Sequence, residues 1–242
     1  MYHPFSVAET TKTAWNIFKK NFATIIVYSF AASFLLLILG AVVEFVIAPE
    51  AFTTKTIVTF MMIFIQAYTT LGLYKLIFTL IDSEYYEFEF RQILPSFKSI
   101  LSYLGVIFLI AFLITTFHFL LLPLNDYPNI QELLQEIAVI VALYLALRTM
   151  FFITFVIDDQ SGGIESIRQS FQLTKGYFFK VLIMLLIILV LIALPAKLSQ
   201  YYPIISIAII FTYPFVNIIL AVTYRKLIYS HQDVDDDIAE TN

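Results

Sequence analysis

Six long apolar runs constrain the fold of this chain more than any other feature. They cover residues 22–43, 56–74, 100–122, 137–157, 181–194 and 204–224, and only the fourth contains a charged residue, Arg148. A helix needs roughly 20 apolar residues to cross a hydrocarbon core about 30 Å thick. The runs are continuous rather than alternating, which argues against strands, because a lipid-facing strand requires a closed barrel.

The predicted fold is therefore all-α, an integral membrane bundle of six helices. We expect spans at about residues 22–47, 56–81, 100–122, 132–157, 178–195 and 204–227, within a single membrane domain over residues 1–230. The composition agrees, since 60% of the residues are hydrophobic and 13% are charged, against roughly 45–50% and about 25% in soluble domains. The chain has no cysteine, which excludes disulfides and thiolate metal ligands.

The distribution of Lys and Arg predicts the orientation, because loops on the cytoplasmic side are enriched in these residues. Lys55 and Lys197 would lie on one side of the membrane. Eleven basic residues would lie on the other side: Lys12, Lys19, Lys20, Lys75, Arg91, Lys98, Arg168, Lys175, Lys180, Arg225 and Lys226. We expect this second side to be cytoplasmic and to hold both termini.

Residues 231–242 are predicted to form an acidic cytoplasmic tail. It holds five carboxylates between Asp233 and Glu240. A solvated, disordered end is the favoured interpretation, and a loose site for a divalent ion is the alternative. The chain has no basic stretch interleaved with aromatic residues, so nucleic acid is not an expected partner.

The polar segments on the basic side are predicted to be amphipathic helices that lie in the membrane interface. Ser6 and Glu9 have the spacing of a capping box, and apolar residues then recur at steps of three and four. Pairs of basic residues seven positions apart occur in three such segments: Lys12 and Lys19, Arg91 and Lys98, Arg168 and Lys175.

These pairs suggest three units of roughly 80 residues, each an interfacial helix followed by a transmembrane hairpin. Trp15 and Phe171 are equivalent in the first and third units, whereas Pro95 interrupts the second. The alternative is that any six-span protein with basic cytoplasmic loops shows evenly spaced Lys and Arg.

Two segments resemble the YciC-like family of bacterial inner-membrane proteins, whose pattern also marks the membrane domain of some glycerophosphodiester phosphodiesterases. They are FSVAETTKTAWNIFKKNF at residues 5–22 and GGIESIRQSFQLTKGYFFKVL at residues 162–182. The preceding VIDDQSGG, residues 156–163, is similar to the family's acidic connection, and Arg148 matches a family arginine. The resemblance implies a location in the bacterial inner membrane. It implies no cofactor or catalytic residue, and no stretch is left for a phosphodiesterase domain.

Arg148 is the most informative single residue. Counted from Ile137, it lies about 16 Å into its helix, near the middle of the membrane, where an arginine costs about 2.5–3.5 kcal/mol. Gln66 and Asn217 fall at a similar depth, as does Pro214, which would free a carbonyl. One hypothesis is a polar layer in which these groups line a cavity. The alternative is that Arg148 only holds helices together or reaches the headgroups.

Other candidate groups are sparse. Glu44 and His118 would lie near the outer ends of their spans, where they could pair and relay protons, although a packing contact is the simpler interpretation. The chain shows no metal-binding H-E-x-x-H pattern, no glycine-rich phosphate loop and no nucleophile elbow. We therefore expect no enzyme activity, no metal site and no cofactor.

These patterns favour a non-enzymatic protein that acts as a partner in a membrane complex or as an organiser of lipid in the envelope. The expected partners are membrane lipids and another membrane protein. Contacts with lipid headgroups and the interface are expected from Lys12, Trp15, Lys19, Lys20, Arg91, Lys98, Arg168, Phe171 and Lys175. The alternative function is a small transporter or lipid-handling permease with a polar pathway at Arg148.

Overall fold

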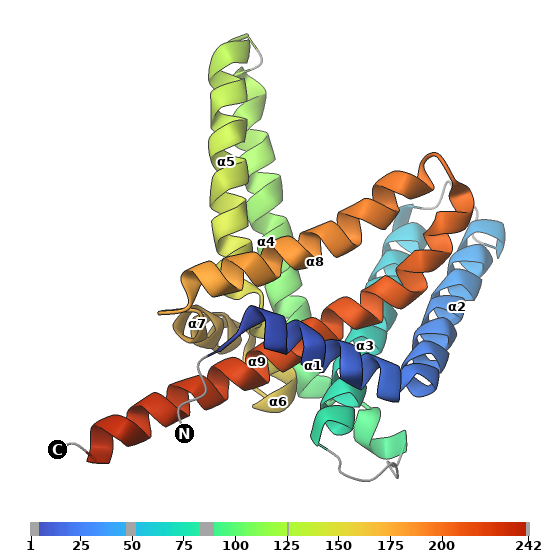
Figure 1. The fold of residues 1–242 in the computed structure, drawn as a ribbon. Coiled ribbons are helices and arrows are strands. Elements are labelled where there is room, and N and C mark those ends of the chain that lie inside the picture. Colours follow the sequence, from blue (N-terminus) through green and yellow to red (C-terminus); the bar gives the residue numbers. More distant parts are fainter. Residues whose placement is uncertain (1–4, 47–51, 83–89, 125, 241–242) are drawn as a thin grey trace.

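All regular structure that the described part of the chain contains is helical. In a computed structural model, the structure describes residues 5–46, 52–82, 90–124 and 126–240 (Figure 1). The elements are α1 (Val7–Lys20), α2 (Phe22–Val46), α3 (Phe52–Asp82), η1 (Phe90–Ile93), α4 (Phe97–Leu121), η2 (Leu122–Leu124), α5 (Pro128–Thr149), α6 (Phe152–Asp158), α7 (Gly163–Leu173), α8 (Phe178–Ser199), η3 (Pro203–Ile207) and α9 (Ala208–Glu240).

The six predicted spans are confirmed as helices long and apolar enough to cross a membrane, as expected of an integral membrane protein. Even the shortest apolar run belongs to a helix of 22 residues, α8. The fourth span differs in detail, because it begins at Pro128 and consists of α5 and α6 with a break at Met150 and Phe151.

The six long helices do not form one closed bundle. Figure 1 shows the α4/α5 hairpin projecting away from α2, α3, α8 and α9. The side chains along this hairpin, such as Phe112 and Ile140, are exposed. In lipid an apolar face has no hydrophobic reason to seek another apolar face, so close packing needs small or polar residues. Leaving these faces against lipid therefore costs little, which is consistent with the separation of the hairpin.

The buried core lies where α3, α6, α7, α8 and α9 meet, at the end of the long helices that also carries α1 and the basic residues of α9. We call this the basic end. Five of the seven residues of α6 are buried, and the largest fully buried side chains include Tyr74, Phe151 and Tyr224. At Gly163, the first residue of α7, an added Cβ would lie 2.8 Å from the carbonyl oxygen of Ser102, so glycine permits the close approach of α7 to α4.

A helix, α1, is present where an amphipathic interfacial helix was predicted, and it packs on α9. Its buried face consists of Thr10, Ala14 and Phe18. The capping box is wrong, because Ser6 occupies the N-cap position but makes no capping hydrogen bond through its side chain. Glu9 instead forms an ion pair with Nζ of Lys226 in α9, at 2.6 Å.

The three predicted units do not have equivalent polar helices. The first and third begin with α1 and α7, but the second has only the four-residue η1 before α4. Arg91 lies in η1 and Lys98 lies in α4, so this basic pair does not share a helix. Pro95 lies between them, and proline disfavours a helical conformation of the residue before it.

The acidic segment at the end of the chain also differs from expectation. The backbone of α9 continues as a helix to Glu240, beyond Ser230, where the segment that could span a membrane ends, so residues 231–240 are helical where a disordered tail was expected.

Ser170 of α7 makes hydrogen bonds to backbone groups on both sides of the break between α5 and α6. Its Oγ donates to the carbonyl oxygen of Arg148 at 2.8 Å and accepts from the backbone N–H of Phe151 at 3.2 Å. Ser170 is fully buried, so both backbone groups depend on this hydroxyl rather than on water.

We predict that Ser170→Ala lowers the free energy of unfolding by about 1–3 kcal/mol, because it leaves buried backbone groups without partners. The matched control is Ser166→Ala on the same helix, because Ser166 is equally buried but its hydroxyl donates only to Gly163 within α7. The measurement is reversible unfolding of both variants in mixed detergent micelles. Equal losses for the two variants would contradict this role of Ser170.

Candidate functional site

The structure does not bring Arg148, Gln66 and Asn217 together in one polar layer. Arg148 lies in the last turn of α5, with its guanidinium 5.1 Å from the centre of the Phe171 ring in α7. Asn217 is buried in α9, where its amide donates to the carbonyl oxygen of Tyr213 at 2.8 Å. Gln66 lines a cavity between α2, α3 and α9.

The depth of Arg148 was counted from Ile137, whereas α5 begins at Pro128. Arg148 lies in the last turn of this helix with its guanidinium against the Phe171 ring, so it joins α5 to α7 at the basic end. This favours the interpretation that Arg148 holds helices together.

The predicted contact between Glu44 and His118 falls outside the described residues, because the side chain of Glu44 is not among them. His118 is exposed on α4, with its ring 6.5 Å from that of Phe119.

The predicted interfacial residues are largely exposed. Trp15 is 47% exposed and makes an edge contact with Phe215 at 5.5 Å between ring centroids. Phe171 is half-buried beneath Arg148. The exposed basic residues are Lys12, Lys19, Lys20, Arg91, Lys98, Arg168 and Lys175.

A cavity of about 210 Å³ lies between α2, α3 and α9, inside the segments that can span a membrane. We call it the hydroxyl cavity, because its polar lining consists of Tyr28, Ser29, Ser33, Gln66, Thr69, Thr70 and Tyr213. None of its lining residues carries a charge. Gln66 was predicted from its depth, whereas the hydroxyl groups were not singled out.

Two features give the hydroxyl cavity unused hydrogen-bonding capacity. Ser29 is 6% exposed and its Oγ has no hydrogen-bond partner among the described residues. Pro214 lies inside α9 and has no N–H, so the helix supplies no donor to the carbonyl of Ile210, a lining residue four positions earlier. The residue whose carbonyl Pro214 is predicted to free, Ile210, thus lies in the wall of the cavity.

Tyr28 closes one side of the hydroxyl cavity. Its hydroxyl donates to the carbonyl oxygen of Thr69 at 2.9 Å. The ring reaches α3 because Gly72 has no side chain, since an added Cβ at this position would collide with the Tyr28 hydroxyl.

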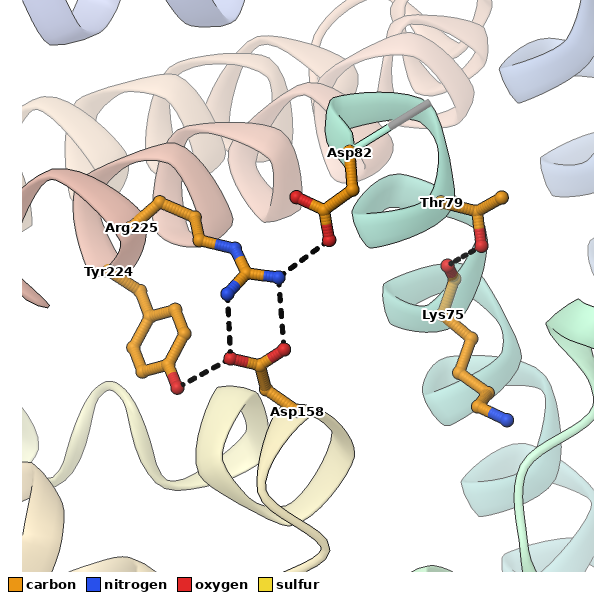
Figure 2. A network of polar contacts seen from close by, with 6 residues as sticks. All are labelled: Lys75, Thr79, Asp82, Asp158, Tyr224 and Arg225. Carbon is orange, nitrogen blue, oxygen red and sulfur yellow. Dashed lines mark hydrogen bonds and ion pairs between the residues drawn. The ribbon is translucent and has the colours of Figure 1, made fainter. Parts of the chain in front are cut away.

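A charged cluster at the basic end joins α3, α6 and α9. Figure 2 shows the guanidinium of Arg225 between Asp158 and Asp82. Arg225 Nη1 and Nη2 donate to the two carboxylate oxygens of Asp158 at 2.9 and 3.0 Å, and Nη2 also donates to Asp82 at 2.6 Å. The hydroxyl of Tyr224 donates to Asp158 at 2.9 Å, and Arg225 lies 4.9 Å from the centre of the Phe78 ring. We call Asp82, Asp158, Tyr224 and Arg225 the Arg225 cluster.

An open cavity of about 420 Å³ adjoins the Arg225 cluster and is lined partly by Asp82 and Asp158. Nζ of Lys75 in its wall donates to the carbonyl oxygen of Leu94 at 2.9 Å. Burial and the neighbouring Asp158 carboxylate raise the pKa of Asp159 above its ordinary value. Both terminal nitrogens of Arg225 are paired with carboxylates, although its Nε has no partner among the described residues, and we assign the cluster a structural role.

The Arg225 cluster was not predicted from the sequence, in which Arg225 counts only as one basic residue of the cytoplasmic side. The one available signal is that Asp82 and Asp158 end two spans while Arg225 follows the last apolar run. Bringing the three together requires the tertiary fold.

The described residues contain no group of three His, Asp or Glu side chains that could hold a metal ion. In the comparisons with known proteins, no family model, curated protein or solved structure matches this chain.

We predict unequal roles for the two carboxylates around Arg225. Asp158 has a side chain 20% exposed and binds in bidentate fashion, so Asp158→Asn should lower the free energy of unfolding by about 2 kcal/mol or more. Asp82 is 52% exposed, so Asp82→Asn should cost less than about 1 kcal/mol. Unfolding in mixed micelles measures both. Removing Arg225 as well, in Asp158→Asn/Arg225→Gln, should recover part of the loss, and strict additivity of the two substitutions would refute the pairing.

Proposed function

We propose that this chain is a non-enzymatic, multi-pass protein of the bacterial inner membrane, with its basic end in the cytoplasm, that binds anionic lipid headgroups and so organises lipid around itself. The observation that carries the proposal is the way α1 is held, with its small and apolar side chains packed on α9 and its lysines exposed. Membership of the YciC-like family is part of the proposal and rests on the two segments at residues 5–22 and 162–182.

The attachment of α1 fixes the positions of its lysines. Thr10, Ala14 and Phe18 are buried, and the Glu9–Lys226 ion pair ties the start of α1 to α9. The opposite side of α1 exposes Lys12, Lys19 and Lys20. The last turn of α1 carries Lys19 and Lys20, whereas its acidic residue, Glu9, lies in the first turn.

Trp15 marks where this surface would meet the membrane. Its indole is half-exposed, and Nζ of Lys19 lies 5.7 Å from the ring centroid. Tryptophan is enriched at the boundary between hydrocarbon and headgroups, and each nearby Lys or Arg adds about 1 kcal/mol of attraction to an anionic surface. Arg168 and Lys175, exposed near α7, extend the basic surface.

A second candidate function is that of a partner in a membrane complex. It is favoured by the projecting α4/α5 hairpin, whose apolar sides are free to contact another membrane protein (Figure 1). A permease pathway at Arg148 has less support, because Arg148 lies beside Phe171 at the end of α5.

We predict that phosphatidylglycerol stabilises the wild-type protein against heat in lipid nanodiscs, relative to phosphatidylcholine alone. Lys12→Gln/Lys19→Gln/Lys20→Gln should weaken the binding of phosphatidylglycerol by at least tenfold, or about 1.4 kcal/mol, because three headgroup contacts are removed. Native mass spectrometry counts the bound lipids, and the thermal midpoint measures their effect.

The matched control is Lys197→Gln, which removes a lysine near the opposite end of α8 and should leave the effect of phosphatidylglycerol unchanged. If the triple variant keeps its full response to this lipid, the lipid-organising function is wrong. Crosslinking of the α4/α5 hairpin to a second membrane protein, unaffected by the triple substitution, would then favour the complex partner.

A further inference from the structure

We propose that the hydroxyl cavity binds the alcohol group of a neutral membrane lipid, and that the apolar chain of this lipid enters the adjoining cavity between α8 and α9. This site lies away from the exposed lysines of α1, so the inference goes beyond the proposed function and does not depend on it.

The cavity offers the hydrogen bonds that an alcohol needs. An alcohol donates one hydrogen bond and accepts others. Oγ of Ser29 is buried without a partner and can serve in either role, while the carbonyl of Ile210 lacks its helix donor because of Pro214. The hydroxyls of Thr70 and Tyr213 are 3.4 Å apart, a long contact that an inserted hydroxyl could replace with two better ones.

The absence of charge among the lining residues favours a neutral ligand. A phosphate or carboxylate taken out of water into this cavity would lose its hydration without gaining an ion pair, which is strongly unfavourable. An alcohol gives up few hydrogen bonds to water, and hydrogen bonds to Oγ of Ser29 and the carbonyl of Ile210 can replace them. The same lack of charge argues against an ion pathway through the cavity.

The position of the cavity indicates that its ligand comes from the membrane. The lining residues of α2 run from Tyr28 to Leu36, about 10–20 Å along a helix that begins at Phe22. A volume of about 210 Å³ corresponds to about seven water molecules at about 30 Å³ each. The polar end of a neutral lipid fits this space, whereas a whole lipid does not.

Space for the apolar chain adjoins the hydroxyl cavity. A second cavity, of about 120 Å³, lies between α8 and α9 and is lined by apolar groups that include Leu191, Ile192 and Pro195. Tyr213 and Ile209 belong to the walls of both cavities. A ligand that places its hydroxyl near Ser29 can therefore extend its chain past Tyr213 towards α8.

Two kinds of lipid carry this chemistry, a diacylglycerol and a long-chain alcohol. We would measure binding to the full-length protein in nanodiscs with dioleoylglycerol and with oleyl alcohol in separate titrations, followed by native mass spectrometry. Methyl oleate, which has a similar chain but no hydroxyl, is the control ligand. We expect saturable binding of one of the two alcohols, which identifies the source, with methyl oleate at least tenfold weaker.

Two variants locate the binding. Ser29→Ala should weaken the alcohol five- to tenfold while leaving the ligand-free protein as stable or more stable, because it removes a buried hydroxyl that has no partner. Ser33→Leu should abolish binding by filling the cavity. Tyr144→Phe removes a hydroxyl from α5, outside the cavity, and should bind as the wild type does. A sedimentation profile and thermal midpoint for each variant establish that it is folded.

The inference is overturned if methyl oleate binds as well as the alcohols, if neither alcohol saturates, or if Ser29→Ala binds like the wild type. Any of these results would mean that the hydroxyl cavity does not recognise the alcohol group of a lipid. Loss of stability in Ser33→Leu does not affect the conclusion, because Ser29→Ala decides it. Alcohol binding that persists in the triple lysine variant would further separate this site from the basic surface of α1.

Discussion

The bidentate contact between Arg225 and Asp158 is the interaction on which the arrangement of the long helices depends. It ties α9 to α6, and the additional contact with Asp82 brings in α3 (Figure 2). Apolar helices in lipid gain nothing from hiding their faces, so polar contacts decide which of them stay together. The described polar contacts between helices gather largely at the basic end, where Glu9–Lys226 and Ser170 join α1 and α7 to the same core.

Anchoring at one end explains the spaces found further along the helices. Beyond the Arg225 cluster, α2, α3 and α9 are held apart by side chains of different sizes, with Tyr28 and Tyr213 next to Ser29 and Ser33. Small polar residues leave room where two aromatic residues act as spacers. Within the described residues, no ion pair involves the α4/α5 hairpin, which projects away from α2, α3, α8 and α9 (Figure 1).

Hydropathy predicted the spans because the length of an apolar run is imposed by the membrane itself. It did not locate the start of α5 at Pro128, because the first turns of this helix contain polar residues such as Gln131 and Glu132. The Arg225 cluster could not be predicted from the sequence for another reason. Asp82, Asp158 and Arg225 are separated by 76 and 67 residues, and the spacing of single charges does not specify which will pair.

The hydroxyl cavity was not predicted because a Ser or Thr residue costs little free energy in a membrane-spanning helix. A Thr or Ser normally donates back to its own helix, as Thr69 does to the carbonyl of Gln66, so its presence indicates nothing about a site. Ser29 differs in having no such partner, which only coordinates reveal. The chain thereby separates two kinds of polar chemistry by depth. The paired charges of the Arg225 cluster lie at the basic end, and uncharged hydroxyl groups line the cavity between α2, α3 and α9.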